Sequence, residues 1–400
     1  MKISRLKSKL KLFYAHFIIP KKDWHRPKKS QVLIYDKSGA DLILPYLTKY
    51  SYIIMPVRGE SINLHCLLRA VFKLKFWQGK IINAHQEAFI ETVSPKVIIT
   101  FIDNNVAFYE LSKRFPSIKT IFIQNGTRGV SGDVFDGLVN SNNYFVDFML
   151  VHGLAIGRHY LKYVSGKFIP IGSLKNNTFN NFNSAIKNDI LFISQWHSRP
   201  LLGDVFYIEN DGTQINWDVF FEAEIKVLRF LDKWCLENNR RLKICGRGEE
   251  KHGPEKEFYS RHLNRCKWKY LPRIDSYSSY KLIDEAALIV FIDSTLGYES
   301  IARGKKAAVF SCRGLSIDSN AANFGWPENL PSNGPFWTND QDETQFRRVM
   351  DYINTVSDEN WKKNRERYAG KLMEFDPGNT RFVALLNQLL PRLENHNYVN

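Results

Sequence analysis

The fold of this chain is decided by the stretch Phe291-Ile-Asp-Ser-Thr-Leu-Gly-Tyr-Glu-Ser-Ile-Ala-Arg-Gly-Lys-Lys306, which the apolar run 307–310 follows. The apolar segment 288–292 predicts a buried strand, and the small polar residues after it predict a turn into a helix. Gly304 is typical of a helix end, and 307–310 predicts a second strand. This order of strand, turn, helix and strand is the repeating unit of a parallel α/β sheet.

The turn in this unit has the composition of a site for a nucleotide or a sugar nucleotide. Backbone N–H groups and hydroxyls of Ser294, Thr295 and Gly297 would lie at a helix N-terminus, which suits a phosphate. Glu299 lies one turn further on, within reach of a sugar hydroxyl. An ordinary capped helix explains the same residues, with Ser294 as the cap and Glu299 in the first turn. The motif alone leaves both interpretations open.

The chain as a whole predicts an α/β protein with two Rossmann-like domains facing a cleft. Its 400 residues suit two domains, because single cores rarely grow beyond about 250–300 residues. Apolar strands alternate with helices in both halves, as in parallel sheets covered by helices. We expect five segments: a basic tail at 1–30, an N-terminal domain at 31–175, an Asn-rich linker at 176–188, a C-terminal domain at 189–370, and a C-terminal helix and tail at 371–400.

The N-terminal tail carries most of the excess charge. Residues 1–30 hold ten Lys and Arg against Asp23 alone, so +9 of the net +15 lies there. Apolar residues spaced for one helical face predict a basic amphipathic helix that attaches through residues 1–29 to an anionic membrane surface. A solvated arm, or a helix packed on the body, is the alternative. The apolar residues of this face are Ile3, Leu6, Leu10, Phe13 and Phe17.

Several function classes find no support in the sequence. The remaining 370 residues carry only +6 and show no zinc-finger spacing or RNA-binding signature, so we expect no nucleic-acid partner. The five cysteines include no C-x-x-C pair and are expected to be reduced core residues, without a metal site. No stretch reaches the roughly 20 apolar residues that span a bilayer. The motifs of P-loop enzymes, α/β-hydrolases and zincins are missing.

Two successive strand ends of the first half carry polar residues. The strand 97–102 runs into Asp103, Asn104 and Asn105. Because ligands in such sheets bind at the carboxyl ends of strands, Asp103 is a candidate general base, although Asp and Asn are also the preferred helix caps.

The next strand, 120–123, ends in Gln124, Asn125 and Gly126, with Arg128 close behind. Amides and a guanidinium beside a glycine could hold a sugar or a phosphate. A plain turn explains Asn125 and Gly126 but gives no reason for Arg128. We therefore expect an acceptor site formed by both strand ends.

In the second half, Gly246 and Arg247 follow another predicted strand. A glycine there lets the backbone approach a phosphate, and Arg247 supplies charge; a solvated surface loop is the alternative. His197, which also follows a strand, is a weaker candidate.

These residues resemble a known family. Five segments are similar to bacterial surface-carbohydrate (O-antigen) biosynthesis proteins of the Leptospira type. They are 97–128, 293–305, 324–327, 334–337 and 376–379. The resemblance extends over about residues 31–385. The Ser-Thr-x-Gly-x-Glu element also looks like the donor segment of GT-B glycosyltransferases, including capsule Kdo transferases that use a CMP-sugar. Those transferases carry a His-Pro motif, which has no counterpart here.

The resemblance implies a cytoplasmic glycosyltransferase, peripheral on the inner face of the membrane, that needs no metal and no cofactor. Its partners would be a nucleotide-sugar donor and a glycan or lipid-linked acceptor. Asp103 would act as the base, with Arg128 holding the acceptor or the departing phosphate. The alternatives are a sugar-nucleotide epimerase of the same architecture and a non-catalytic scaffold of a polysaccharide assembly complex. If the protein is a glycosyltransferase, we expect the donor to be held by Gly246, Arg247, Ser294, Thr295, Gly297 and Glu299. The acceptor would be held by Asn104, Asn105, Gln124, Asn125 and Gly126.

Overall fold

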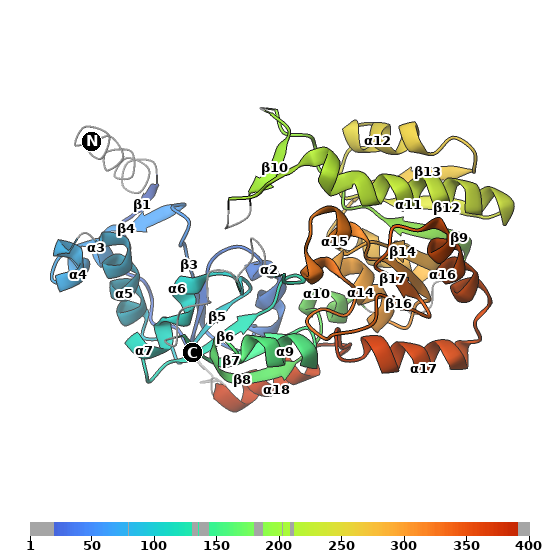
Figure 1. The fold of residues 1–400 in the computed structure, drawn as a ribbon. Coiled ribbons are helices and arrows are strands. Elements are labelled where there is room, and N and C mark those ends of the chain that lie inside the picture. Colours follow the sequence, from blue (N-terminus) through green and yellow to red (C-terminus); the bar gives the residue numbers. More distant parts are fainter. Residues whose placement is uncertain are drawn as a thin grey trace, which may run out of the picture.

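A computed structural model describes residues 20–78, 80–129, 135, 144–179, 187–201, 203–208 and 212–390. These residues form two α/β units, each built around its own sheet (Figure 1). The predicted fold class, with two parallel-sheet units, is confirmed. The predicted amphipathic helix of the tail lies, up to residue 19, outside the described residues.

The first unit contains a six-stranded sheet in which every neighbouring pair is parallel. Its order is β3 (Tyr52–Met55), β2 (Val32–Tyr35), β5 (Val97–Thr100), β6 (Lys119–Ile123), β7 (Phe145–Val151) and β8 (Ser165–Pro170). Its helices are α2 (Ala40–Ile43), α3 (Leu64–Ala70), α4 (Leu74–Trp77), α5 (Ile81–Val93), α6 (Val106–Tyr109), α7 (Leu111–Arg114), α9 (Leu154–Tyr160) and α10 (Leu174–Thr178). A short parallel pair, β1 (Lys21–Asp23) with β4 (Ser61–Asn63), lies beside this sheet.

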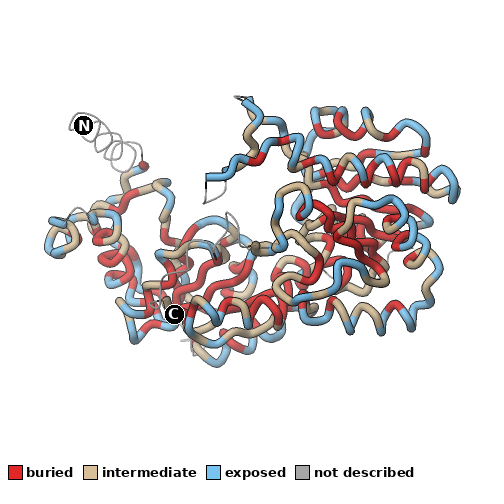
Figure 2. The backbone as a smooth tube through the Cα atoms, in the orientation of Figure 1, coloured by how far each residue is buried: buried red, intermediate tan, exposed pale blue. Residues whose placement is uncertain are grey.

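The strands of this sheet are apolar on both faces because both faces are covered. Leu33 and Tyr35 of β2 pack in one core with α5, whereas Val32 and Ile34 of the same strand pack in a second core on the opposite face. Successive side chains of a strand point to opposite faces, so a fully apolar strand requires two covering layers. Figure 2 shows the buried strands running through the middle of each unit.

The second unit contains a seven-stranded sheet that is parallel except for its last pair. Its order is β13 (Trp268–Leu271), β12 (Arg241–Cys245), β9 (Lys187–Ile193), β14 (Ala286–Phe291), β15 (Ala307–Phe310), β17 (Trp337–Thr338) and β16 (Asn333–Gly334). Its helices are α11 (Trp217–Glu237), α12 (Pro254–His262), α13 (Ser278–Glu285), α14 (Thr295–Ala302), α15 (Arg313–Ser316), α16 (Glu343–Thr355) and α17 (Asp358–Ala369). A hairpin of β10 (Val205–Ile208) and β11 (Gln214–Asn216) leads into α11. A single 3-10 turn, η3 (Asn320–Ala322), also belongs to this unit, and another, η2 (Leu44–Tyr46), follows α2 in the first unit.

The chain crosses between the units twice. Helix α10 overlaps the start of the predicted linker, and its Asn176 and Asn177 are fully buried instead of lying in an open connection. After α17 the chain returns to the first unit, where α18 (Thr380–Leu389) packs against that unit's sheet. The side chain of Asn177 donates to Asn379 at 2.8 Å, which joins the two crossings. The Asn-rich composition therefore serves buried hydrogen bonds as well as a connection.

The described residues bear on three further expectations. All five cysteines are buried and free. No helix of the described segments is long and apolar enough to cross a membrane. No cluster of three or more His, Cys, Asp or Glu suited to a metal ion occurs within those same segments.

Candidate functional site

The strand-turn-helix unit of residues 288–304 forms as predicted. Strand β14 ends at Phe291, Ser294 precedes α14 in an extended conformation, and Gly304 ends the unit at φ +92°. Gly297 is required for packing, because a Cβ there would lie 2.1 Å from the ring of Phe291. Gly297 thus lets the helix approach the strand.

Five of the six predicted donor residues line one pocket of about 490 Å³, here called the basic pocket. Ser294, Thr295 and Glu299 come from α14 and the turn before it, and Gly246 and Arg247 follow β12. Three cations face the same space: Arg247, Lys175 and Arg273. Burial lowers the pKa of the Lys175 ammonium, with Glu299 acting in the opposite direction. Sequence reasoning missed Lys175, which lies in α10 beside the predicted linker, and gave Arg273 no role as a cation, although that residue closely follows β13.

A buried carboxylate shapes the loop of Gly246 and Arg247. Glu255, in the first turn of α12, accepts from the backbone N–H of Arg247 at 3.0 Å and of Gly248 at 2.8 Å. The hydroxyl of Tyr270 donates to the same carboxylate, and a Cβ on Gly246 would lie 2.4 Å from that hydroxyl. The loop is therefore held against α12, and this leaves the Arg247 side chain directed at the pocket.

The Arg247 guanidinium donates to Nε2 of His197. Burial, reinforced by Arg247 and Arg313, lowers the pKa of His197, so this imidazole is neutral and able to accept. No ion pair of Arg247 is found in the described part of the chain. Its charge remains available to an anion in the basic pocket.

Glu299 is 5% exposed and lines the basic pocket. It accepts a hydrogen bond of 2.8 Å from the hydroxyl of Tyr280. Burial raises the pKa of its carboxyl group, while Ser173, Tyr280 and Lys175 oppose that shift. A carboxylate in this position can accept from ligand hydroxyls beside the bound phosphate.

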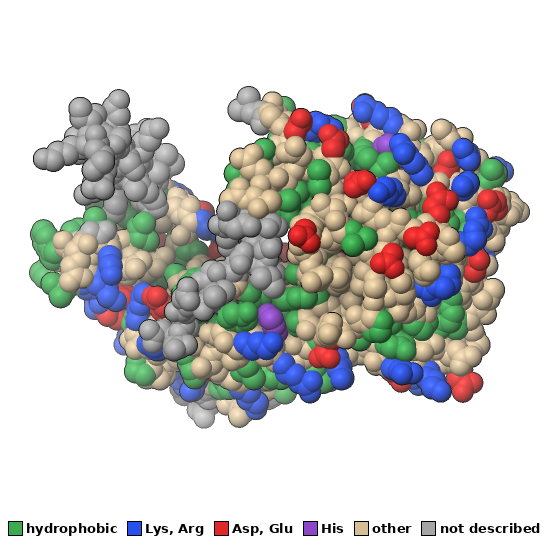
Figure 3. Space-filling model, in the orientation of Figure 1, with side chains coloured by type: hydrophobic (Ala, Val, Ile, Leu, Met, Phe, Trp, Pro, Cys, Tyr) green, Lys and Arg blue, Asp and Glu red, His purple; other side chains and the backbone are tan. Residues whose placement is uncertain are grey.

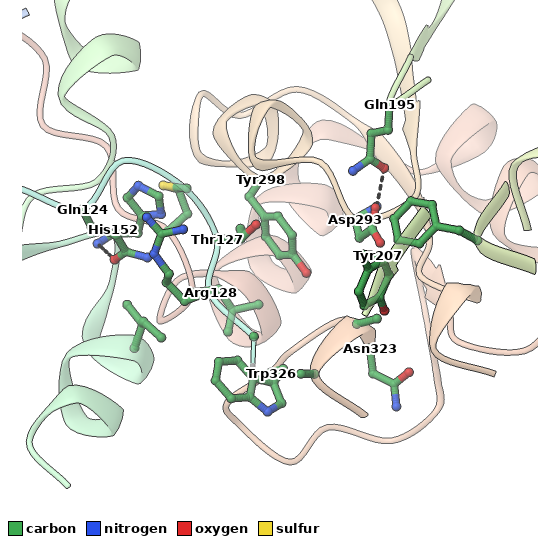
Figure 4. A pocket seen from close by; sticks show the side chains of 17 residues that line it. Gln124, Thr127, Arg128, His152, Gln195, Tyr207, Asp293, Tyr298, Asn323 and Trp326 are labelled. Carbon is green, nitrogen blue, oxygen red and sulfur yellow. Dashed lines mark hydrogen bonds between the residues drawn. The ribbon is translucent and has the colours of Figure 1, made fainter. Parts of the chain in front are cut away.

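A second pocket, of about 380 Å³, lies between the two units and is here called the interdomain pocket (Figure 4). Gln124, Arg128 and His152 line it from the first unit, and Tyr298 and Asn323 face them from the second. Burial lowers the pKa of His152 to about 4, so its imidazole is neutral at pH 7. The charged groups of the pocket are thus one arginine and one carboxylate, that of Asp293, and the rest of the lining is neutral, partly hydrogen-bonding and partly apolar.

The basic pocket and the interdomain pocket share Thr127, Gln195 and Asp293. The carboxyl ends of β6 and β14 meet here, where the backbone N–H of Thr127 donates to Oγ1 of Thr295 at 3.0 Å. The sequence expectation of a cleft built from both halves is realised at this contact. One elongated ligand could therefore occupy both pockets.

Asp293 occupies the junction of the two pockets. Its Oδ2 accepts from Nε of Arg313 at 2.8 Å, and its backbone N–H donates to Gln195 at 3.3 Å. Its Oδ1 is buried and has no hydrogen-bond partner among the described residues, although the side chain as a whole is 20% exposed. Asp293 was part of the opening motif, at the first position after the strand, and that position was the signal for it.

The predicted catalytic pair, Asp103 and Arg128, does come together. Arg128 donates to the Asp103 carboxylate from Nε at 2.8 Å and again from Nη2. The hydroxyl of Tyr160 adds a bond of 2.6 Å, and the N–H of Asn125 one of 3.3 Å. Asp103 is fully buried and lines neither pocket. Its carboxylate positions Arg128, which does line the interdomain pocket.

The predicted acceptor residues divide among three places. Gln124 lines the interdomain pocket and Asn125 the basic pocket, and Gln124 holds the turn by donating to the carbonyl of Gly126 at 2.8 Å. Asn104 and Asn105 lie in a separate open pocket, where Asn105 caps α6. The capping alternative is therefore realised for Asn105.

Solved structures with the same fold include two UDP-N-acetylglucosamine 2-epimerases. One, from Methanocaldococcus jannaschii, is 11% identical with a TM-score of 0.50, over 89% of this chain and 99% of that one. The other is 12% identical with a TM-score of 0.50, over 92% and 98%. The wall teichoic acid polymerase TagF is 9% identical with a TM-score of 0.48, over 90% and 89%. At these identities the likeness is one of fold.

Sequence comparison identifies the family. No curated protein matches the chain. A family model described as "putative O-antigen biosynthesis protein" matches residues 121–390, a segment that begins within β6 and contains the whole second unit and α18. Because the match extends over more than half of the chain and includes most residues of both pockets, the chain belongs to this family of O-antigen biosynthesis proteins.

Proposed function

We propose that the protein is a glycosyltransferase that moves a sugar from a nucleotide-sugar donor to a glycan or lipid-linked acceptor in surface polysaccharide synthesis. Membership of the O-antigen biosynthesis family supports the pathway. The fold shared with UDP-N-acetylglucosamine 2-epimerases supports a nucleotide sugar as ligand. The observation that carries the proposal is the junction of a cationic pocket with an interdomain pocket at Asp293.

The donor's diphosphate would bind in the basic pocket. Arg247, Arg273 and Lys175 supply positive charge there, and the N-terminus of α14 adds its dipole. Negative charge develops on the diphosphate as it leaves, so these groups stabilise the transition state more than the bound donor. Glu299 would accept from hydroxyl groups of the donor beside the diphosphate.

The acceptor would enter the interdomain pocket. Oδ1 of Asp293 would take the proton of an acceptor hydroxyl, whose oxygen then forms the new bond to the anomeric carbon. The bond from that carbon to the diphosphate oxygen breaks, and the nucleoside diphosphate departs with the electron pair. Asp293 is preferred to Asp103 as the base because it lines both pockets and its buried Oδ1 has no hydrogen-bond partner among the described residues, whereas Asp103 lines neither pocket and is held by four hydrogen bonds.

A thermal-shift panel of CMP-, UDP-, GDP- and dTDP-sugars tests the donor site. A ligand at one hundred times its Kd adds about 2.7 kcal/mol of stability, which is a shift of several degrees. We expect one nucleotide class to stabilise the protein, and Arg247→Gln to weaken that effect. Arg261→Gln is the matched control, since Arg261 is exposed on α12, away from both pockets. If none of these nucleotide sugars stabilises the protein, the transferase proposal fails and the non-catalytic scaffold remains as the alternative.

Product analysis then separates transfer from epimerisation. The stabilising nucleotide sugar is incubated with the protein, with and without a lipid-linked or oligosaccharide acceptor. Transfer requires the acceptor and releases the nucleotide. Conversion of the donor to its epimer without an acceptor, and without release of the nucleotide, would overturn the proposal in favour of an epimerase.

A further inference from the structure

An apolar surface at the far end of the first unit is unrelated to either pocket. It is formed by the end of α3, the connection to α4, and α4 itself, and is here called the apolar tip, residues 68–77. Phe72 is 91% exposed, Leu74 and Trp77 are each 72% exposed, and Leu68 is 69% exposed. Figure 3 shows hydrophobic side chains gathered at the end of the molecule where Figure 1 places α3 and α4.

Exposure of this kind indicates a partner surface. Single exposed apolar residues are ordinary, but a contiguous group of large ones marks contact with a protein or a membrane. The indole N–H of Trp77 already donates to the carbonyl of Val71 at 2.8 Å. The ring can therefore enter an apolar medium without leaving a donor unpaired.

The charged residues of the apolar tip and its flanks are all basic, and two of the four are paired with acids of α5. Residues 64–80 contain four Lys and Arg and no Asp or Glu. Lys73 and Lys75 pair with Glu91 and Glu87 of α5, whereas Arg69 and Lys80 are exposed and form no ion pair with the described residues.

A second basic segment is attached beside the tip. Strand β1 pairs with β4, which leads directly into α3, so Lys21 and Lys22 lie next to the start of that helix. The side chain of Asn63 reinforces the attachment. It donates to Asp23 at 3.1 Å and to the carbonyl of His25 at 2.8 Å, and it accepts from the N–H of Cys66 as the cap of α3.

We propose that the apolar tip docks into the interface of an anionic lipid bilayer. Tryptophan, phenylalanine and leucine flanked by lysine and arginine are the combination that such an interface binds, through apolar burial together with attraction to anionic headgroups. A second copy of the chain would oppose two surfaces of the same charge, which disfavours self-association. The proposal is independent of residues 1–19 and of the proposed transferase activity.

Site-specific fluorescence tests insertion directly. Phe72→Cys is labelled with the environment-sensitive dye NBD, and the label is selective because all five native cysteines are buried. Vesicles contain phosphatidylglycerol and phosphatidylcholine, or phosphatidylcholine alone. We expect a blue-shifted, brighter emission with the anionic vesicles only, and a weaker one in about 0.5 M salt. Leu201→Cys, at a fully exposed apolar position of the second unit, is the control and should not respond.

Vesicle flotation with unlabelled protein separates the tip from the tail. Phe72→Ser with Leu74→Ser should lower the partition onto anionic vesicles about tenfold or more, with an unchanged melting temperature because both side chains are exposed. Leu201→Ser should bind as the parent protein does. The proposal is overturned if the double variant binds normally, if deletion of residues 1–19 alone abolishes binding, or if the label at position 72 stays in water.

Discussion

Arg313 donates from Nε to Oδ2 of Asp293 at 2.8 Å, with a side chain that is only 1% exposed. The same guanidinium stacks on Phe220 at 4.0 Å from the ring centre and lies 3.9 Å from the buried carboxylate of Glu224. Arg313 thus fixes Oδ2 of Asp293, a residue that lines both pockets, while Oδ1 is buried and has no hydrogen-bond partner among the described residues.

Asp293→Asn should abolish transfer and spare the fold. An asparagine can still accept from Arg313 through its amide oxygen, but it cannot take a proton from an acceptor. General-base catalysis contributes about 10²–10⁴-fold, so kcat should fall by that range. The measurement is acceptor-dependent nucleotide release, with nucleotide-induced stabilisation as the control for binding. Transfer within threefold of the parent protein, about 0.7 kcal/mol, would exclude Asp293 as the base.

Arg313→Gln should destabilise the protein by about 3 kcal/mol, since it leaves two carboxylates without their cation in a buried setting. Adding Glu224→Gln should recover about 1 kcal/mol, because it removes one of those unpaired acids. Urea unfolding of both single variants and the double variant measures the coupling. Strictly additive effects would show that Arg313 and Glu224 do not interact.

Asp103→Asn should act mainly on stability, and any loss of activity should follow from the weakened fold. The substitution removes the charge that faces the nearly buried guanidinium of Arg128, whose side chain is 10% exposed. Loss of one partner of such a pair costs about 3 kcal/mol or more. A clear drop in melting temperature is expected. Normal stability with complete loss of transfer would instead support Asp103 as the base, as the sequence suggested.

Glu224 should make stability depend on pH between about 5 and 7. Burial raises the pKa of its carboxyl group to about 7, so the folded protein keeps a proton that the unfolded chain releases near pH 4.5. The free energy of unfolding therefore falls as pH rises through this window, by about 1–3 kcal/mol from this group. His152, with a pKa lowered to about 4, acts with the opposite sign.

The comparison with Glu224→Gln isolates this contribution. The amide keeps an acceptor for the hydroxyl of Tyr259, which donates to Glu224 at 2.6 Å. Urea unfolding at pH 5, 6, 7 and 8 should show that the variant gains stability relative to the parent protein as pH rises. Parallel curves would refute the pH dependence assigned to Glu224.

Glu299→Gln should weaken nucleotide-sugar binding about tenfold while the fold persists. The amide oxygen can still accept from Tyr280, so the loss would come from the missing charge toward ligand hydroxyls. The readout is the nucleotide concentration that gives half of the thermal shift. Glu257→Gln, on the exposed side of α12, is the control. If the parent protein and Glu299→Gln bind the nucleotide sugar with equal affinity, the role of Glu299 is purely structural.

The sequence predicted those helices that show a long hydrophobic periodicity, because this pattern is local. The apolar periodicity of residues 81–93 and 217–237 predicts a helix in each segment, and α5 and α11 have these same bounds. The pattern of residues 63–74 predicts a single helix, but two helices form there, since Lys73 adopts an extended conformation at the start of α4. Strands β16 and β17, with two residues each, are too short for any periodicity to be visible.

The basic pocket was largely predictable, and the interdomain pocket was not. Ser294, Thr295, Glu299, Gly246 and Arg247 each follow a strand of one sheet, so their convergence follows from the topology. The interdomain pocket combines residues of both units with the segment 321–326 and with Leu372 and Met373, which no local pattern connects. The role of Asp103 was equally hidden, because it depends on what surrounds the carboxylate.

The sequence by itself determined the two parallel sheets and the donor motif, because periodicity, turns and strand ends are properties of adjacent residues. It also located the charge of the tail. Only the tertiary structure decided which carboxylate faces the junction of the pockets. Asp103 is paired with Arg128, 25 residues away, and with Tyr160, 57 residues away, whereas Asp293 keeps one oxygen unpartnered among the described residues. Burial and pairing arise between segments distant in the chain, and so they are set by how the units pack rather than by any local pattern.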